Sequence, residues 1–275
     1  MRLNRIICLA AVTAFSMVQA EETYSYLSLS SPSTLSSTQD DFHWQGVVAS
    51  GRAIEIKGIK GNIRAEPTSG SKVEVVASKH STRSNRDEVQ IRVVEHKDGV
   101  TICAVYPRGD AGEPNQCLPG EGKSHTHNND VRVDFTVRVP AGVRLIARTV
   151  DGDLEAALLD GNIEAYSING NIRISTAGYA QAKSITGSIS ASLGNANWAG
   201  QIEFETITGE ITLKLPRMSN TELHAESNTG IISTEFPLSI QGSVGQQSMN
   251  GTLGDGGRKL VLKTNTGAIK LLRAT

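Results

Sequence analysis

The chain has few aromatic side chains, few cysteines and no excess of charge of either sign. Phe, Trp and Tyr together make up 4% of the 275 residues, and the formal net charge is −1. Proteins that bind nucleic acid need a basic surface that neutralises several phosphates, and those that bind single strands add aromatic stacking platforms. The composition therefore argues against a nucleic-acid partner.

Long hydrophobic runs are also missing. A membrane-spanning helix needs about 20 apolar residues, whereas the apolar run at residues 6–15 is half that length. It follows Arg2 and Arg5 and precedes Val18-Gln19-Ala20, as in a secretory signal peptide cleaved after Ala20. We therefore expect an extracytoplasmic bacterial protein, periplasmic or secreted, with no integral membrane segment once residues 1–20 are removed. Cleavage leaves 25 of the 27 Lys and Arg residues against 28 acidic residues, a net charge of −3.

Of the three cysteines, Cys8 lies in the signal segment, which leaves Cys103 and Cys117 in the mature chain. A single pair in an oxidising compartment predicts a disulfide. The enclosed residues include two prolines and two glycines, so they form a loop rather than a regular element. Closing it should stabilise the fold by about 3 kcal/mol. A redox or zinc site is the alternative, but the separation of 14 residues matches neither a C-x-x-C motif nor a zinc knuckle.

What the sequence does contain is a repeated ten-residue motif with a central glycine. The motif has a core-type residue, a Ser or Thr, a variable residue, then Asp, Asn or Thr, then Gly, a variable residue and Ile or Leu. Successive glycines between residues 147 and 270 are separated by 18, 17, 22, 21, 21 and 16 residues. An upstream copy centres on Gly61, and Gly161 marks a half-unit. The predicted repeat-turn glycines are Gly61, Gly152, Gly161, Gly170, Gly187, Gly209, Gly230, Gly251 and Gly267.

A recurrence of about 20 residues is typical of stacked coils. We predict an all-β, solenoid-like stack of short strands with about 18–21 residues per coil, in which glycine permits tight turns. The predicted core is an aliphatic ladder, one coil apart, of Leu154, Ile172, Ile189, Ile211, Ile232, Leu253 and Ile269. An antiparallel meander or sandwich is the alternative, because Asn-Gly at 169–170 and at 250–251 is a hairpin signal.

The predicted organisation has four parts. Residues 1–20 are the signal peptide, 21–41 a Ser/Thr-rich lead-in, 42–142 an N-terminal β segment with a disulfide-clipped loop, and 143–275 the β-repeat array. The N-terminal segment alternates apolar and polar residues as half-buried strands do, but long polar loops break its period. Either a separate domain or an atypical cap of the array would fit this pattern.

The Ser/Thr-x-Asn/Thr-Gly-x-Ile unit, after a signal peptide and an alternating strand, resembles the bacterial putative-adhesin family of envelope β-repeat domains, related to the toast-rack domains. The likeness covers residues 50–275. It implies an extracytoplasmic β-solenoid with an adhesive or structural role, and it supplies no catalytic residues. The long loop between the two cysteines departs from the family pattern.

Candidate reactive residues do not form a recognisable site. Glutamates that could act in pairs, as in glycoside hydrolases, are spread along the array and interleaved with Arg173, Lys183 and Lys214; they are Glu155, Glu164, Glu203, Glu205, Glu210, Glu222, Glu226 and Glu235. Acidic turns at 151–153 and 254–257 occur once each, unlike repeated calcium-binding turns. His125 and His127 lack a third metal ligand. Trp44, Trp198, Tyr166 and Tyr179 are more consistent with packing than with a sugar-stacking patch.

We therefore predict no catalytic, cofactor or metal site. The expected function is that of a non-enzymatic adhesin or scaffold domain whose partner is an envelope protein or glycan. A polysaccharide-acting enzyme on a β-helix and a sensory module of an envelope-stress system are the alternatives.

Overall fold

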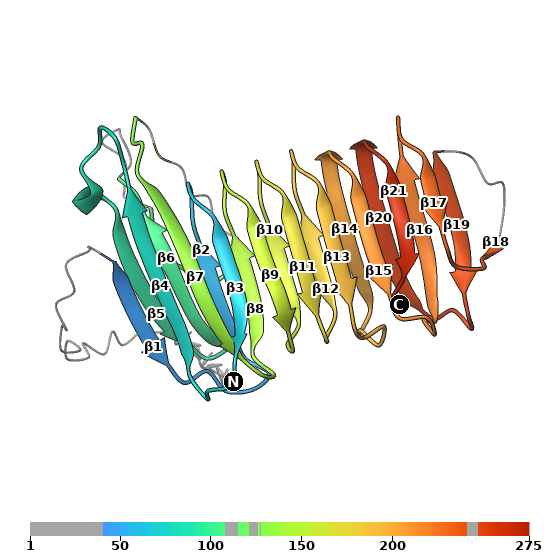
Figure 1. Cartoon of the computed structure of the whole chain (residues 1–275), viewed down its shortest axis with the longest axis horizontal. Helices are drawn as coiled ribbons and strands as arrows, with labels where there is room; N and C mark the ends of the chain where they lie inside the picture. The colour runs from blue at the N-terminus through green and yellow to red at the C-terminus, as the bar shows by residue number, and fades with distance from the viewer. Residues whose placement is uncertain (1–40, 108–114, 121–125, 127, 241–246, 275) are drawn as a thin grey trace, which may run out of the picture. The chain divides into compact units, whose positions relative to one another are not determined.

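The computed structural model describes residues 41–107, 115–120, 126, 128–240 and 247–274 (Figure 1). The predicted signal peptide and all but one residue of the lead-in lie outside these residues, as do His125 and His127. No helix within the described part of the chain is long and apolar enough to cross a membrane.

Two sheets enclose one continuous hydrophobic core. Sheet A contains, in spatial order, β1 (Phe42–Gly46), β4 (Val73–His80), β7 (Arg132–Pro140), β3 (Ile63–Thr68), β9 (Leu154–Leu159), β11 (Ile172–Thr176), β13 (Ile189–Leu193), β15 (Ile211–Leu215), β21 (Ile269–Arg273) and β17 (Ile232–Thr234). Sheet B contains β5 (Gln90–His96), β6 (Gly99–Val105), β2 (Ala53–Lys57), β8 (Arg144–Arg148), β10 (Ile163–Tyr166), β12 (Ala180–Lys183), β14 (Gln201–Thr208), β20 (Arg258–Thr266), β16 (Thr221–Ser227), β19 (Ser248–Leu253) and β18 (Ser239–Ile240). A short 3₁₀ helix, Arg86–Glu88, precedes β5.

Each coil consists of one strand of sheet B followed by one strand of sheet A. From β6–β7 to β16–β17, equivalent strands of neighbouring coils pair in parallel. The pairing of β1, β4, β5, β18 and β19 is antiparallel, and these strands lie at the two ends of the sheets. The predicted all-β stack of coils is therefore confirmed, and the antiparallel alternative applies only to the ends.

The aliphatic ladder exists, but its predicted order is wrong at the C-terminal end. Ile172, Ile189 and Ile211 pair in sequence, as expected. Ile211 then pairs with Ile269, which pairs in turn with Ile232. Leu253 lies instead in β19 of sheet B, opposite Thr221. The last coil in the sequence, β20–β21, is thus inserted between β14–β15 and β16–β17, as the dark red strands among the orange ones show in Figure 1.

The length of β20 gives a physical reason for this insertion. It is a nine-residue strand, Arg258–Thr266, with buried Leu260 and Leu262. In the inserted position it pairs with β14 on one edge and with β16 on the other, over seven residue pairs each. Both of its edges are therefore hydrogen-bonded, whereas a strand at the end of a sheet leaves one row of backbone groups unpaired.

The N-terminal end of the sheets has the same kind of exchange. The coil β2–β3, which carries Gly61, lies between β6–β7 and β8–β9. Ile63 therefore pairs with Phe135 on one side and with Leu154 on the other. Strands from residues 42–142 and from 143–275 share both sheets, and residues 39–275 form one compact unit. The boundary at residue 142 marks a change in loop length, and neither sheet is interrupted there.

Candidate interaction surfaces

The repeat glycines stack directly on one another where each strand of sheet B turns into sheet A. We call this row of turns the turn column. In spatial order it contains Gly61, Gly152, Gly170, Gly187, Gly209, Gly267 and Gly230. From Gly152 onward, a Cβ atom on any of them would lie 1.7–2.1 Å from the carbonyl oxygen of the preceding glycine in the column. Gly152 and Gly230 lack a positive φ. The requirement that all members share is therefore close approach of the backbones, and positive φ is an additional demand at only some of them.

The Ser or Thr of the motif holds adjacent turns together. Its buried hydroxyl donates a hydrogen bond to the glycine carbonyl of the neighbouring coil, 2.8–3.2 Å away; the donors are Thr149, Ser167, Ser184, Thr206, Thr264 and Ser227. Each of these hydroxyls has its partner, so burial leaves no donor unsatisfied. The conserved spacing of Ser/Thr and Gly in the repeat thus encodes one contact between coils.

The residue after the glycine forms a second ladder. The side chain of Asp134 accepts a hydrogen bond from the backbone N–H of Asn62, and the side chain of Asn62 accepts one from the N–H of Asp153. The same pattern continues through Asn171, Ser188 and Glu210. The acidic turn at 151–153 therefore belongs to a structural ladder, in which Asp153 accepts a hydrogen bond from its neighbour in the next coil.

Two of the predicted turn glycines lie elsewhere. Gly161 is in the opposite turn, between β9 and β10, where a Cβ would meet the carbonyl oxygen of Val143 at 2.0 Å. Gly251 lies inside β19, paired with Leu223 and Ile240, and its nearest neighbouring atom would be 3.3 Å from a Cβ. The position of Gly251 differs from the predicted turn because the Asn250-Gly251 pair is part of an antiparallel strand.

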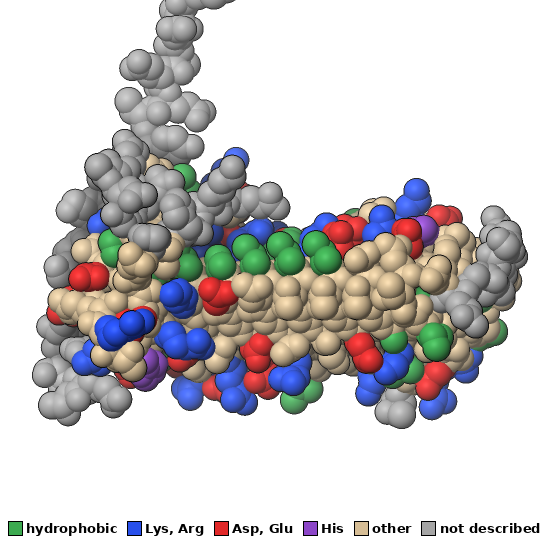
Figure 2. Space-filling model, turned by 90° about the horizontal axis from the view of Figure 1, so that it is seen from above, with side chains coloured by type: hydrophobic (Ala, Val, Ile, Leu, Met, Phe, Trp, Pro, Cys, Tyr) green, Lys and Arg blue, Asp and Glu red, His purple; other side chains and the backbone are tan. Residues whose placement is uncertain are grey.

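The turn column carries a row of aliphatic side chains, of which three isoleucines are exposed and Val150 is partly buried. They occupy the variable position two residues before the glycine, and we call Val150, Ile168, Ile185 and Ile207 the aliphatic stripe. The three isoleucines are 41%, 45% and 49% exposed. Backbone hydrogen bonds of 2.7–2.9 Å join Val150, Ile168 and Ile185 to the next coil, and the N–H of Ile207 donates to the carbonyl oxygen of Ile185 at 3.2 Å. Figure 2 shows a row of hydrophobic side chains along the edge of the flat surface formed by these turns.

The stripe has defined ends. In the coil next to Val150 the equivalent residue is Ile59, which is buried at 3% exposure. Beyond Ile207 the equivalent residues are Asn265 and Asn228, whose side chains hydrogen-bond to each other. The apolar surface therefore extends over four coils.

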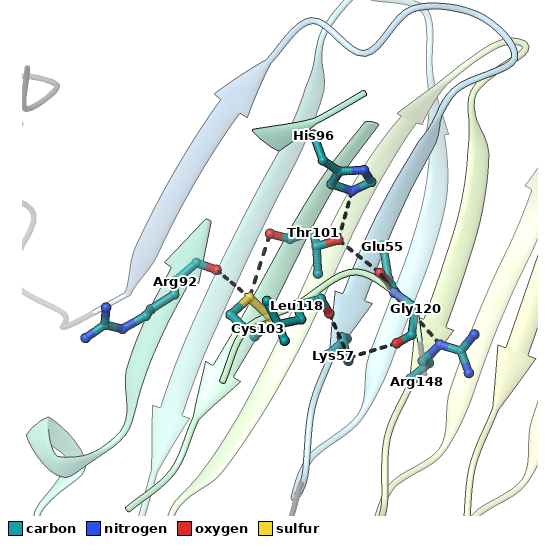
Figure 3. Close-up of a disulfide and its surroundings, with 10 residues drawn as sticks. Glu55, Lys57, Arg92, His96, Thr101, Cys103, Leu118, Gly120 and Arg148 are labelled. Atoms are coloured by element: carbon teal, nitrogen blue, oxygen red, sulfur yellow. Dashed lines mark hydrogen bonds and ion pairs between the residues drawn. A yellow bond between two sulfur atoms is a disulfide. The ribbon is translucent and has the colours of Figure 1, made fainter. Parts of the chain in front are cut away.

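The disulfide Cys103–Cys117 fastens residues 115–120 across the outer face of sheet B, and we call this segment the strap (Figure 3). Beneath the strap, the ammonium group of Lys57 donates hydrogen bonds to the carbonyl oxygens of Leu118 and Gly120, at 2.9 Å each. Burial lowers the pKa of Lys57, and the nearby carboxylate of Glu55 opposes that shift. The strap and sheet B are thus joined by a covalent bond and by the hydrogen bonds of the buried Lys57.

Glu55 is the centre of this network and is 2% exposed. One carboxylate oxygen accepts hydrogen bonds from the hydroxyl of Thr101 at 2.9 Å and from the N–H of Gly120 at 3.0 Å. The other forms an ion pair with Nε of Arg148 at 3.1 Å. A buried charge is tolerated when it is paired and hydrogen-bonded in this way. Glu55 therefore has a structural explanation, which the sequence analysis missed.

Removal of the disulfide should measurably weaken the fold. We expect Cys103→Ser/Cys117→Ser to lower the free energy of unfolding by about 3 kcal/mol, because the unfolded chain regains the entropy of an open loop. Urea unfolding of the mature protein measures this difference. The wild-type intact mass should also lie two hydrogens below the mass after reduction. Two free thiols in protein prepared under oxidising conditions would contradict the prediction.

The glutamates proposed from sequence lie on several strands and mostly bind nearby cations. Lys183 bridges Glu203 at 2.6 Å and Glu205 at 3.1 Å, and these hydrogen bonds raise its pKa. Arg144 pairs with Glu164 at 2.8 Å. Further pairs join Arg64 to Glu155 and Lys270 to Glu210. This arrangement forms a charged sheet surface with internal pairing.

The remaining candidates are also dispersed. Trp198 is 1% exposed, and its indole N–H donates to the carbonyl of Lys259 at 3.2 Å. Trp44 packs against the core from β1, whereas Tyr166 lies in β10 under the guanidinium group of Arg148, 4.0 Å from the ring centroid. Among the described residues, no group of three His, Cys, Asp or Glu side chains could hold a metal ion.

A shallow hollow of about 410 Å³ lies on the outer face of sheet B near its C-terminal end. Glu222, His224, Lys259 and Lys263 contribute charged or polar groups to it, and β14, β20, β16 and β19 form its floor. His224 is already hydrogen-bonded to Asn250.

Solved structures that resemble the chain include two crystal structures of low sequence identity. No family model and no curated protein matches the chain. A crystal structure of a putative cell adhesion protein from Clostridium sporogenes is similar, with 11% identity, a TM-score of 0.46 and coverage of 85% of this chain and 100% of the other. A putative adhesin from Bacteroides fragilis is similar over 85% of this chain and 98% of its own, with 13% identity and a TM-score of 0.36.

Proposed function

We propose that this protein is an adhesin-like, non-enzymatic interaction domain of the bacterial cell envelope, located in the periplasm or outside the cell. The observation that carries the proposal is the aliphatic stripe. Exposed side chains of this kind are unremarkable singly, whereas a contiguous apolar row bordered by polar residues is typical of an interaction surface.

The turn column makes the stripe well suited to binding. Backbone hydrogen bonds and the Ser/Thr hydroxyls fix the position of each coil against the next. A partner that docks on a rigid surface does not have to order it, so less conformational entropy is lost on association. The regular spacing of the stripe would thus contribute directly to affinity.

Two features support the extracytoplasmic location. The first twenty residues have the pattern of a secretory signal. The disulfide that fastens the strap is of a kind that persists in oxidising compartments and is rare in the cytosol.

An enzyme on this fold would need acidic, basic and aromatic groups gathered on a few adjacent coils. The carboxylates of Glu203 and Glu205 instead share Lys183, and that of Glu55 lies beneath the strap. These contacts favour an interaction domain over a hydrolase.

Binding of the mature chain to a panel of envelope glycans and purified envelope proteins tests the proposal. The variant Ile168→Ser/Ile185→Ser/Ile207→Ser should bind its ligand at least about tenfold more weakly, because the apolar area removed from water decreases. A matched control, Arg173→Ser/Lys214→Ser, changes the outer face of sheet A and should leave binding unchanged. Absence of binding to every probe and to the immobilised chain itself, or cleavage of a glycan by the mature chain, would overturn the proposal.

A further inference from the structure

We propose that the partner of the aliphatic stripe is a second copy of this chain, and that the two copies pair stripe to stripe with their coil axes antiparallel. This inference rests on the proposed function and specifies it as homophilic binding. A two-fold axis would cross the stripe midway between Ile168 and Ile185. Ile168 would then face the partner's Ile185, and Val150 would face the partner's Ile207.

The residues beside the stripe favour this orientation. Arg148, Tyr166, Lys183 and Glu205 form a row on the outer face of sheet B, in register with one another. Each lies two residues before a stripe residue, and side-chain alternation places it on the same side of the chain. The row is basic at Arg148 and acidic at Glu205. Figure 2 shows basic side chains beside the hydrophobic row and acidic ones where the row ends.

An antiparallel pair makes these charges complementary. Arg148 faces the partner's Glu205, and by symmetry Glu205 faces the partner's Arg148. In a parallel pair the two-fold axis would run along the stripe, so the charged rows of the two copies would lie on opposite sides of it and would not meet. Only the antiparallel arrangement therefore brings opposite charges of the two rows together.

The groups involved can reach a partner. The side chains of Lys183 and Glu205 form an ion pair with each other at 3.1 Å, and they remain 44% and 42% exposed, so the Glu205 carboxylate can accept a second cation. The side chain of Arg148 is 19% exposed; its ion pair with Glu55 is made through Nε, and its terminal NH₂ groups are the donors for a second carboxylate. Fixed on one side by Glu55 and on its face by Tyr166, this cation is held in place before the partner binds.

The size of the stripe predicts a weak dimer that does not grow further. Four coils at about 4.8 Å per step span about 14 Å. Such a contact is smaller than the roughly 800 Å² per partner of a stable complex, so association should depend strongly on concentration and salt. A two-fold contact uses the stripe of both copies completely and closes on itself.

Sedimentation of the mature protein over a range of concentrations tests dimerisation. We expect a monomer–dimer equilibrium that Ile168→Ser/Ile185→Ser weakens at least tenfold and that the control Arg173→Ser/Lys214→Ser leaves unchanged, with both variants keeping the wild-type melting temperature. A monomer at every concentration would overturn the inference. If the wild type stayed monomeric but bound an envelope probe, and Ile168→Ser/Ile185→Ser/Ile207→Ser lost that binding, the interaction function would stand without the homophilic contact.

Cross-linking tests the orientation. Chains with Val150→Cys and chains with Ile207→Cys, mixed and mildly oxidised, should form a disulfide-linked heterodimer, because these positions face each other. Neither variant should cross-link to itself, since its two cysteines would lie about 14 Å apart, beyond the Cβ separation of about 4 Å that a disulfide needs. Self-cross-linking of either variant without the heterodimer would show a parallel contact and contradict the proposal.

Discussion

Replacement of Ile189 by aspartate is expected to leave the mature chain unfolded. Ile189 is 1% exposed and lies between Ile172 and Ile211 in the ladder of sheet A. Loss of the isoleucine costs about 2–5 kcal/mol, and burial of a carboxylate without a partner adds several more. Together these terms match the typical stability of a domain, roughly 5–15 kcal/mol. Circular dichroism should show loss of the β spectrum and of the cooperative melting transition.

A neighbouring substitution provides the control. Ser190 is exposed, and its side chain points away from the core beside Arg173 and Thr212. Ser190→Asp should therefore melt within a few degrees of the wild type. If Ile189→Asp melted at the same temperature as Ser190→Asp, the assignment of Ile189 to the buried face of its strand would be wrong.

The second large effect is expected at the turn column. In Gly187→Ala the new methyl group would lie 2.0 Å from the carbonyl oxygen of Gly170, and the φ of +146° is strained for alanine. The backbones of two coils must separate to accommodate it, which also weakens the hydroxyl contacts of Ser184 and Thr206. We expect strain and overpacking to lower the free energy of unfolding by at least about 3 kcal/mol. Urea unfolding measures this difference.

Gly251→Ala is the matched control because the repeat pattern places both glycines in the same class. Gly251 lacks a positive φ, and its nearest neighbouring atom would be 3.3 Å from the new methyl group. This substitution should cost about 1 kcal/mol or less. Equal losses of unfolding free energy in the two variants would mean that the close approach of the coils is not the reason why glycine is required in the turn column.

The coil architecture was predictable because each repeat satisfies several local demands at once. Gly170 and Gly187 mark the turns, and the alternation at Ile172 and Ile174 identifies the inward face. The order of the coils was not predictable. Ile211, Ile232 and Ile269 offer the same aliphatic surface, so the sequence around them does not distinguish which coil lies next to which.

The candidate surfaces were harder to predict from the sequence than the coils. The stripe occupies a position that the repeat leaves variable, and the one signal was that Val150, Ile168, Ile185 and Ile207 share aliphatic side chains there. Glu55 and Lys57 alternate with buried isoleucines in β2, which is also the pattern of a solvated sheet face. Their burial depends on the strap, some 60 residues later in the chain, and local patterns carry no information about such a contact.

The insertion of the last coil has a consequence for biogenesis. Residues 258–273 leave the ribosome after the rest of the described chain, and yet β20 and β21 fill the space between β14–β15 and β16–β17. Until they arrive, the edges of β14 and β15 remain open, and open strand edges are sites of misassembly. The C-terminal coils can therefore close only after residue 273 has emerged. A chain truncated before residue 258 would have a gap inside its stack, whereas a solenoid built in sequence order would only be shorter.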